Sequence, residues 1–149
     1  MKKLFLICMA LCSTFAIVAW INAQNKNAMK KKKVEIQKTR SLDFILDSSK
    51  DWEPAGEGVT RKIMGYDGQV MLVKVKFEKK AVGTPHRHYH TQTTYVASGK
   101  FEFDIEGKKQ IVSAGDGIYI EPDALHGCVC LEEGLLIDCF APMRDDFLK

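Results

Sequence analysis

Short apolar and alternating runs follow one another along the chain from Val59 onward. Residues 70–77 are apolar at first and alternate with lysine at the far end, which predicts a strand that runs from a core to a rim. At residues 101–106, phenylalanine and isoleucine alternate with acidic residues, which predicts a strand with one buried and one solvated face. Helical periodicity is essentially absent from this part of the chain.

Turn residues separate the predicted strands. Glu106-Gly107-Lys108 predicts a hairpin, and Gly115-Asp116-Gly117 predicts a second turn. The other predicted strands are residues 95–97, 111–112, 118–120, 127–131 and 135–140. Residues 42–46 are interpreted as a short strand or a helical turn, and residues 51–58 and 79–85 as turns. Short strands with turns about every ten residues predict one all-β domain, a sandwich or barrel, over residues 41–149.

The N-terminus is organised like a secretory signal peptide. Met1-Lys2-Lys3 is followed by an apolar run over residues 4–21 and then by Asn22-Ala23-Gln24. We predict a signal peptide over residues 1–23 with cleavage after Ala23, and therefore a periplasmic or secreted protein without stable membrane insertion after cleavage. An uncleaved anchor is the alternative, and the lysines at 30–33 count against both interpretations because basic residues after an apolar segment resist translocation. The polar, lysine-rich residues 24–40 are predicted to be a basic disordered linker.

The formal net charge of +3 conceals an uneven distribution. The first forty residues hold nine basic residues and one acidic residue, whereas the remainder holds thirteen basic and eighteen acidic residues. The predicted β domain therefore carries a net charge of about −5. This charge argues against a nucleic-acid partner.

The cysteines do not predict a disulfide framework. Cys8 and Cys12 belong to the predicted signal peptide, so the domain retains the odd number of three, Cys128, Cys130 and Cys139. Cys128 and Cys130 are too close in sequence for the Cys-x-x-Cys pattern of zinc or redox sites. We interpret these cysteines as small, buried, apolar side chains.

Three of the four histidines of the chain fall within His86-Arg87-His88-Tyr89-His90. Alternate side chains share a face of an extended segment, so His86, His88 and His90 are able to project to one side. We expect the fourth histidine, His126, beside them. Because imidazole nitrogens are common ligands of divalent transition metals, the cluster predicts a metal site, with surface or core histidines as the alternative.

These histidines lie within two stretches that resemble the motifs of the cupin superfamily. The first motif corresponds to Gly83, His86, His88, Gln92 and Gly99, and the second to Gly115-Asp116 through His126. The chain departs from the second motif at Glu121 and Asp123, where proline and glycine are usual. The resemblance implies an all-β double-stranded β-helix, or jelly-roll barrel, with one divalent metal held by His86, His88, Gln92 and His126.

Gln92 stands where many cupins place glutamate. Three imidazoles and an amide leave the charge of the ion uncancelled, which makes the ion a stronger Lewis acid. Nickel, zinc, iron and manganese all suit such a ligand set. The alternative for Gln92 is a hydrogen bond to a neighbour without metal ligation.

Within the cupins, residues 52–148 resemble the pectin-degradation proteins of the KdgF type, most specifically in the ending from Leu136 to Leu148. That family is understood to convert 4,5-unsaturated uronate monosaccharides, released by pectin or alginate lyases, into linear keto-deoxyuronates. The resemblance implies a small acidic sugar substrate, with Asp138 and Arg144 as the catalytic residues: Asp138 as acid/base and Arg144 as the clamp for the substrate carboxylate. The further candidate substrate contacts are Phe140, His90 and Arg61. The resemblance also implies a homodimer.

Alternatives stay open for the residues and for the whole protein. Asp138 and Arg144 are also able to form a salt bridge at a strand end, and Phe140 is also able to fill the core. A cupin dioxygenase acting on a small molecule is a second enzyme class for this chain. A non-catalytic module that binds sugar acids is a third hypothesis, because one fold supports many functions.

Overall fold

The computed structural model describes residues 17–31 and 40–149. The chain divides into two units, residues 1–38 and 39–149. In the first unit, residues 17–31 form a helix whose side chains are all exposed. Within the part of the chain that the structure describes, no helix is long and apolar enough to cross a membrane.

This helix differs from the disordered linker predicted to begin at residue 24. Residues 24–31 contain neither glycine nor proline, and alanine, methionine and lysine among them favour helix, so the helix continues beyond the apolar run. Residues 1–16, which make up most of the predicted signal peptide, and residues 32–39 lie outside the described residues. The signal peptide, its cleavage after Ala23 and the cellular location stay predictions.

The second unit is built from antiparallel strands, as the sequence predicted. The strands are β1 (Glu53–Gly56), β2 (Val59–Tyr66), β3 (Met71–Phe77), β4 (Val82–His86), β5 (Thr91–Ile105), β6 (Lys108–Ser113), β7 (Gly117–Ile120) and β8 (His126–Ala141). Two short 3-10 helices, η1 (Asp47–Ser49) and η2 (Asp145–Leu148), lie before and after them. The strands join into one eight-stranded sheet, which confirms the all-β domain.

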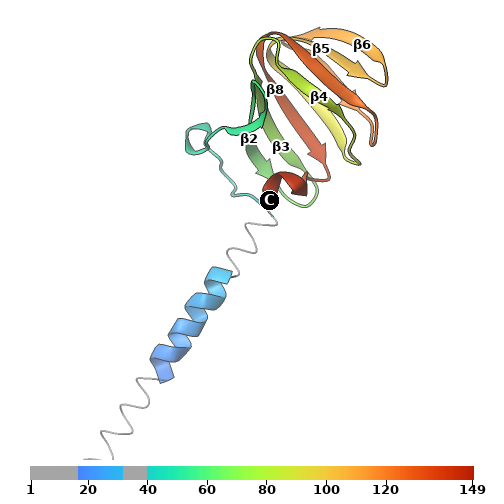
Figure 1. Cartoon of the computed structure of the whole chain (residues 1–149). Coiled ribbons are helices and arrows are strands. Elements are labelled where there is room, and N and C mark those ends of the chain that lie inside the picture. Colours follow the sequence, from blue (N-terminus) through green and yellow to red (C-terminus); the bar gives the residue numbers. More distant parts are fainter. Residues whose placement is uncertain (1–16, 32–39) are drawn as a thin grey trace, which may run out of the picture. The chain divides into compact units, whose positions relative to one another are not determined.

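The two longest strands, β5 and β8, organise this domain (Figure 1). The first half of β5 pairs with the second half of β8, and these halves continue the sheet to β7 and β3. The second half of β5 pairs with the first half of β8, and these halves carry β6 and β4. β5 and β8 therefore each belong to two parts of the sheet, one with β3 and β7 and the other with β4 and β6.

Two glycines permit the close approach where β5 and β8 change their pairing. Gly99 has a φ of +82°, and a Cβ at this position would lie 2.6 Å from the carbonyl oxygens of Glu132 and Glu133. A Cβ on the opposing Gly134 would lie 2.3 Å from the carbonyl oxygen of Ser98. Only glycine fits such positions, which gives a physical reason for the second glycine of the first motif.

The core contains the inward-facing residues of the strands. Phe101 and Phe103 are buried, while the neighbouring Glu102 and Asp104 are partly exposed, which confirms the predicted alternation over residues 101–104. Phe77 packs edge-on against Phe101 with ring centroids 5.4 Å apart. A second buried cluster of Met71, Val73 and Phe140 packs against the C-terminal residues Met143, Phe147 and Leu148.

The predicted turns at 51–58 and 79–85 were partly wrong, because each contains a strand. All four residues of β1 are exposed and the strand pairs only with β2, while β4 pairs only with β8. Both are edge strands that contain a proline, and they lack the apolar alternation that marks a half-buried strand. The separate strands predicted at 95–97 and 101–106 belong to one strand, β5, which ends at Ile105, and those at 127–131 and 135–140 are one strand, β8.

Candidate metal centre and adjoining cavity

Three histidines meet where β4 ends and β8 begins. His86 is the last residue of β4 and lies opposite His126, the first residue of β8, in the ladder between these strands. Their rings are 4.4 Å apart between centroids, and the His88 ring lies 4.9 Å from that of His126. One nitrogen from each of the three side chains lies within 4.8 Å of the others. The predicted cluster of His86, His88 and His126 is therefore present.

Backbone carbonyl groups orient all three imidazoles, because each accepts a hydrogen bond from the Nδ1 atom of one ring. The Nδ1 atoms of His86, His88 and His126 lie 2.8–3.1 Å from the carbonyl oxygens of Thr84, His90 and Ala124 respectively. Each Nδ1 therefore carries the proton, and each Nε2 keeps a lone pair. The Nε2 of His126 is buried without a hydrogen-bond partner. An ion among the three Nε2 atoms would satisfy this buried atom, so the residues fit a metal.

The environment of the cluster favours neutral imidazoles. Burial lowers the pKa of His126 to about 4, and it also lowers the pKa of His88. The mutual repulsion of the histidines and the charge of Arg144 act in the same direction on both groups. Both side chains are consequently in their metal-binding form at neutral pH.

The turn that departs from the second motif supports this centre. Asp123 adopts a φ of +61°, which explains why glycine is usual at this position. Its backbone N–H donates to the carbonyl oxygen of His88 at 2.8 Å. The turn thus ties the loop that carries His88 to the start of β8, and His126 keeps its register despite the different residues.

Gln92 is buried on β5 beside the histidines. Its Oε1 lies 3.0 Å from Nε2 of His88, and its Nε2 donates to the hydroxyl of Thr94 at 3.0 Å. Because Nδ1 of His88 carries that ring's proton, Nε2 and Oε1 present lone pairs to each other, as two ligands of one ion would. The geometry suits Gln92 as the fourth ligand of the predicted set, and this role stays a prediction.

The nitrogens of His90 do not join the three-histidine group, although the His90 ring lies 5.3 Å from the His88 ring between centroids. β4 ends at His86 and the chain bends at residues 89–90 before β5 begins, so the alternation of a strand does not apply. The His90 ring is buried, stacks near Tyr89, and places its Nε2 3.2 Å from the carbonyl oxygen of Met143. His90 does not line the adjoining cavity, and its predicted contact with substrate stays a prediction.

A cavity of about 300 Å³ adjoins the histidines. This volume is at the lower end of the roughly 300–1,000 Å³ of small-molecule sites. The residues predicted from sequence that line it are His86, Gln92, Asp138, Phe140, Arg144 and Arg61. Side chains more than fifty positions apart in the chain thus meet in one space.

Asp138 is the buried carboxyl group of this cavity, with 8% of its surface exposed. Its Oδ1 accepts a hydrogen bond of 2.6 Å from the hydroxyl of Thr94. Burial raises the pKa of Asp138 to about 6, while hydrogen bonds from Thr94 and Gln92 and the charge of Arg144 oppose this rise. A carboxyl group with a pKa near neutrality is able both to accept and to deliver a proton.

Arg144 is held by an acidic partner and by aromatic rings. Its Nε and Nη2 donate to the two carboxylate oxygens of Asp146 at 2.9 and 2.7 Å, so its ion pair is not with Asp138. Its guanidinium carbon lies 4.2 Å from the centroid of Phe147 and 5.5 Å from that of Phe140. Arg61 stacks on Phe147 as well, at 3.8 Å. Phe147 therefore contacts two guanidinium groups at the wall of the cavity.

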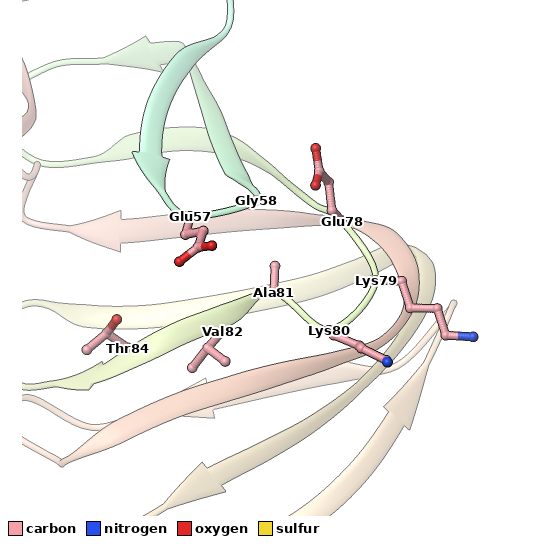
Figure 2. Close-up of a pocket in the computed structure, with 8 residues that line it drawn as sticks. All are labelled: Glu57, Gly58, Glu78, Lys79, Lys80, Ala81, Val82 and Thr84. Atoms are coloured by element: carbon pink, nitrogen blue, oxygen red, sulfur yellow. The ribbon is translucent and has the colours of Figure 1, made fainter.

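A larger hollow of about 480 Å³ lies at the turns that join β1 to β2 and β3 to β4 (Figure 2). Acidic Glu57 and Glu78 and basic Lys79 and Lys80 stand on its rim, and Val82 and Thr84 lie along β4. It contains none of the residues predicted from sequence and no cluster of metal ligands. The chemistry therefore concentrates in the smaller cavity beside the histidines.

Comparison with known proteins identifies the family. Residues 73–137 match the family described as "Cupin domain". The pectin degradation protein KdgF of Dickeya dadantii (strain 3937) is 47% identical over 107 residues, which cover 70% of this chain and 97% of that protein. The chain belongs to the KdgF family of cupins.

Solved structures agree with this membership. KdgF from a Halomonas species is 40% identical with a TM-score of 0.68, and the match covers 72% of this chain and 99% of that structure. An RmlC-like cupin from Shewanella frigidimarina NCIMB 400 is 37% identical with a TM-score of 0.71, covering 73% of this chain and 98% of that structure. The all-β cupin fold of this KdgF family member is thereby established.

Sequence reasoning missed two residues of the candidate site, Thr94 and Phe147. Thr94 lies two positions after Gln92 on the same face of β5, so the period of a strand was the available signal. Phe147 lies within the C-terminal stretch that carried the family resemblance. No local pattern indicates that its ring packs between Arg61 and Arg144, because that contact depends on the way η2 folds back.

Proposed function

We propose that this protein is a metal-dependent enzyme that converts 4,5-unsaturated uronate monosaccharides from pectin or alginate lyases into linear keto-deoxyuronates. We further propose that it acts in the periplasm or outside the cell. The observation that carries the proposal is the single cavity in which His86 and Gln92 adjoin Asp138, Phe140 and Arg144. The 47% identity to a pectin degradation protein supports the choice of substrate class.

The proposed reaction needs an anion clamp and a proton carrier. A divalent ion held by His86, His88, Gln92 and His126 would supply Lewis-acid polarisation of sugar oxygens. Arg144 binds the uronate carboxylate with its planar guanidinium, and Phe140 forms a wall against the sugar ring. The uronate carboxylate must share this guanidinium with Asp146, which accepts hydrogen bonds from its Nε and Nη2 atoms.

Asp138 moves the proton in this scheme. Its carboxylate takes the proton of the anomeric hydroxyl, the anomeric carbon becomes a carbonyl carbon, and its bond to the ring oxygen breaks. The electron pair of that bond stays on the ring oxygen, which forms an enolate with the existing double bond. The carboxylic acid then returns the proton to the enol carbon, which yields the open-chain keto acid without gain or loss of atoms. One buried carboxyl group with a pKa of about 6 suits both steps at neutral pH.

The assay follows the loss of the conjugated chromophore of a 4,5-unsaturated galacturonate and of its alginate-derived counterpart. Purified protein, analysed for bound nickel, zinc, iron and manganese, is expected to accelerate this loss over a blank without protein. Thermal stabilisation by the uronate without turnover would indicate a binding module instead. Oxygen consumption in place of ring opening would indicate a dioxygenase.

Replacement of Arg144 by lysine is expected to raise KM about tenfold or more while kcat changes by less than about threefold. Lysine keeps the charge but loses the two-point fork and the stacking on Phe147 and Phe140. Steady-state kinetics of the two variants R144K and R61K measure this effect. R61K serves as the comparison because Arg61 also lines the cavity and stacks on Phe147. A larger rise of KM in R61K would assign the carboxylate to Arg61.

A further inference from the structure

Thr94 lies between the proposed metal ligand Gln92 and the proposed acid/base Asp138. Its side chain is almost fully buried, with 2% of its surface exposed. Its hydroxyl accepts a hydrogen bond from Nε2 of Gln92 at 3.0 Å and donates one to Oδ1 of Asp138 at 2.6 Å. Thr94 does not line the cavity, so a direct contact with substrate does not account for this arrangement.

We propose that Thr94 is a positioning residue. Its hydroxyl fixes the orientation of the Gln92 amide, so that the amide oxygen faces the histidines, and it also holds the Asp138 carboxylate in place. A hydroxyl has a single proton, and Thr94 gives it to Asp138. The lone pairs of the hydroxyl can then be met only by the NH₂ group of Gln92. Oε1 of Gln92 is consequently directed toward His88, where it lies 3.0 Å from Nε2.

The strand register makes this coupling possible. Gln92 and Thr94 are two residues apart on the inward face of β5, and both are buried. Across the ladder to β8, Thr94 lies opposite Asp138 and Gln92 lies opposite Phe140. A valine at position 94 would keep the branched shape and remove both hydrogen bonds. The amide of Gln92 would then keep only its hydrogen bond to Asp138, which leaves it less restrained against turning its NH₂ group toward the metal. The nitrogen of a neutral amide is a poor metal ligand, because its lone pair is delocalised into the carbonyl group.

The test measures metal affinity, which does not require turnover. Dissociation constants for Ni²⁺ and Zn²⁺ are determined by competition with a chromophoric chelator for the wild type, T94V, T94S and T93V. T94V is expected to bind both ions about 10–100-fold more weakly, the usual effect of removing a hydrogen-bond partner of a metal ligand. T94S keeps the hydroxyl and is expected to stay within about threefold of the wild type. T93V is the matched control, since Thr93 has the same side chain on the outward face of the same strand.

Two results would overturn the proposal: T94V binding both ions as tightly as T93V, or T94S binding them as weakly as T94V. If T94V does not fold by circular dichroism, the pair T94S and T94A decides, because these variants differ only by the hydroxyl. Failure of the wild type to bind either ion would overturn the inference as well. The inference rests on the proposed function for the role of Asp138. A wild type that binds metal without turning over uronates would refute the proposed function and leave the positioning of Gln92 by Thr94 intact. In an active protein, T94V should lower kcat more than it raises KM.

Discussion

Asp138→Asn lowers kcat by about 10²–10⁴-fold and leaves the metal content of the protein unchanged. Asparagine has nearly the same shape as aspartate and still accepts the hydrogen bond that Thr94 donates to Oδ1. It is unable to take up and return a proton, and the loss of a positioned acid/base has effects of this size. The expected result is thus an enzyme with an intact metal centre that no longer opens the ring. Chromophore loss and elemental analysis of the same preparation measure the two quantities.

The stability of the metal-free variant gives a second, independent readout. Burial raises the pKa of Asp138 to about 6, so the folded protein binds this proton more tightly than the unfolded chain does. The stability of the wild type therefore decreases as the pH rises from the unfolded value through about 6, and the ionised carboxylate costs on the order of a few kcal/mol above that pH. At pH 8 the metal-free D138N protein should unfold at a temperature no lower than the wild type.

A matched control separates this effect from a general response to mutation. Asp51→Asn makes the same chemical change at an exposed residue outside the cavity, and it should leave kcat, metal content and unfolding temperature unchanged. If D138N loses metal in proportion to activity, Asp138 supports the metal centre rather than the proton transfer. A D138N protein that keeps more than half of the wild-type kcat would contradict both roles.

The strands that were predicted correctly are those with a buried face. The alternation at residues 101–106 marked part of β5 because Phe101 and Phe103 enter the core. β1 and β4 were not predicted, because an edge strand is stabilised by its hydrogen bonds to the neighbouring strand. Its own residues do not show that pairing. Gly99 lies between two strands that were predicted separately, whereas it allows β5 to continue past the backbone of β8.

The candidate site also contains residues that the sequence predicted and contacts that it could not predict. His86, His88 and His126 could be predicted because their spacing belongs to motifs with a chemical reason, and Asp138 and Arg144 because they lie in the stretch that resembles the family. Their support could not be predicted. The contact of Thr94 with Asp138 depends on the register between β5 and β8, and the backbone carbonyls that orient the imidazoles belong to the local chain geometry.

His126→Asn abolishes the thermal stabilisation that a divalent ion gives to the wild type. A ligand at about 100 times its dissociation constant stabilises a folded protein by about 2.7 kcal/mol, which corresponds to roughly 10 °C or more for a domain of about one hundred residues. In the wild type, Nε2 of His126 is buried without a hydrogen-bond partner, and a bound ion would satisfy it. The side-chain NH₂ group of asparagine is a donor close to the position of histidine Nδ1, which faces the Ala124 carbonyl oxygen. Asparagine has no atom that replaces Nε2.

The metal-free form of H126N should therefore fold as stably as the metal-free wild type, and only its response to the ion should be lost. His90→Asn is the matched control, because His90 is equally buried and places its Nε2 near the carbonyl oxygen of Met143 instead of in the three-histidine group. H90N should retain the stabilisation by Ni²⁺ or Zn²⁺ in a thermal unfolding titration. Retention of the full shift in H126N would remove His126 from the ligand set, and equal loss in both variants would show that the shift does not depend on the three-histidine group in particular, because His90 also lies close to Asp145 and Asp146. The contrast between two buried histidines thus tests the geometry of the centre without reference to its reaction.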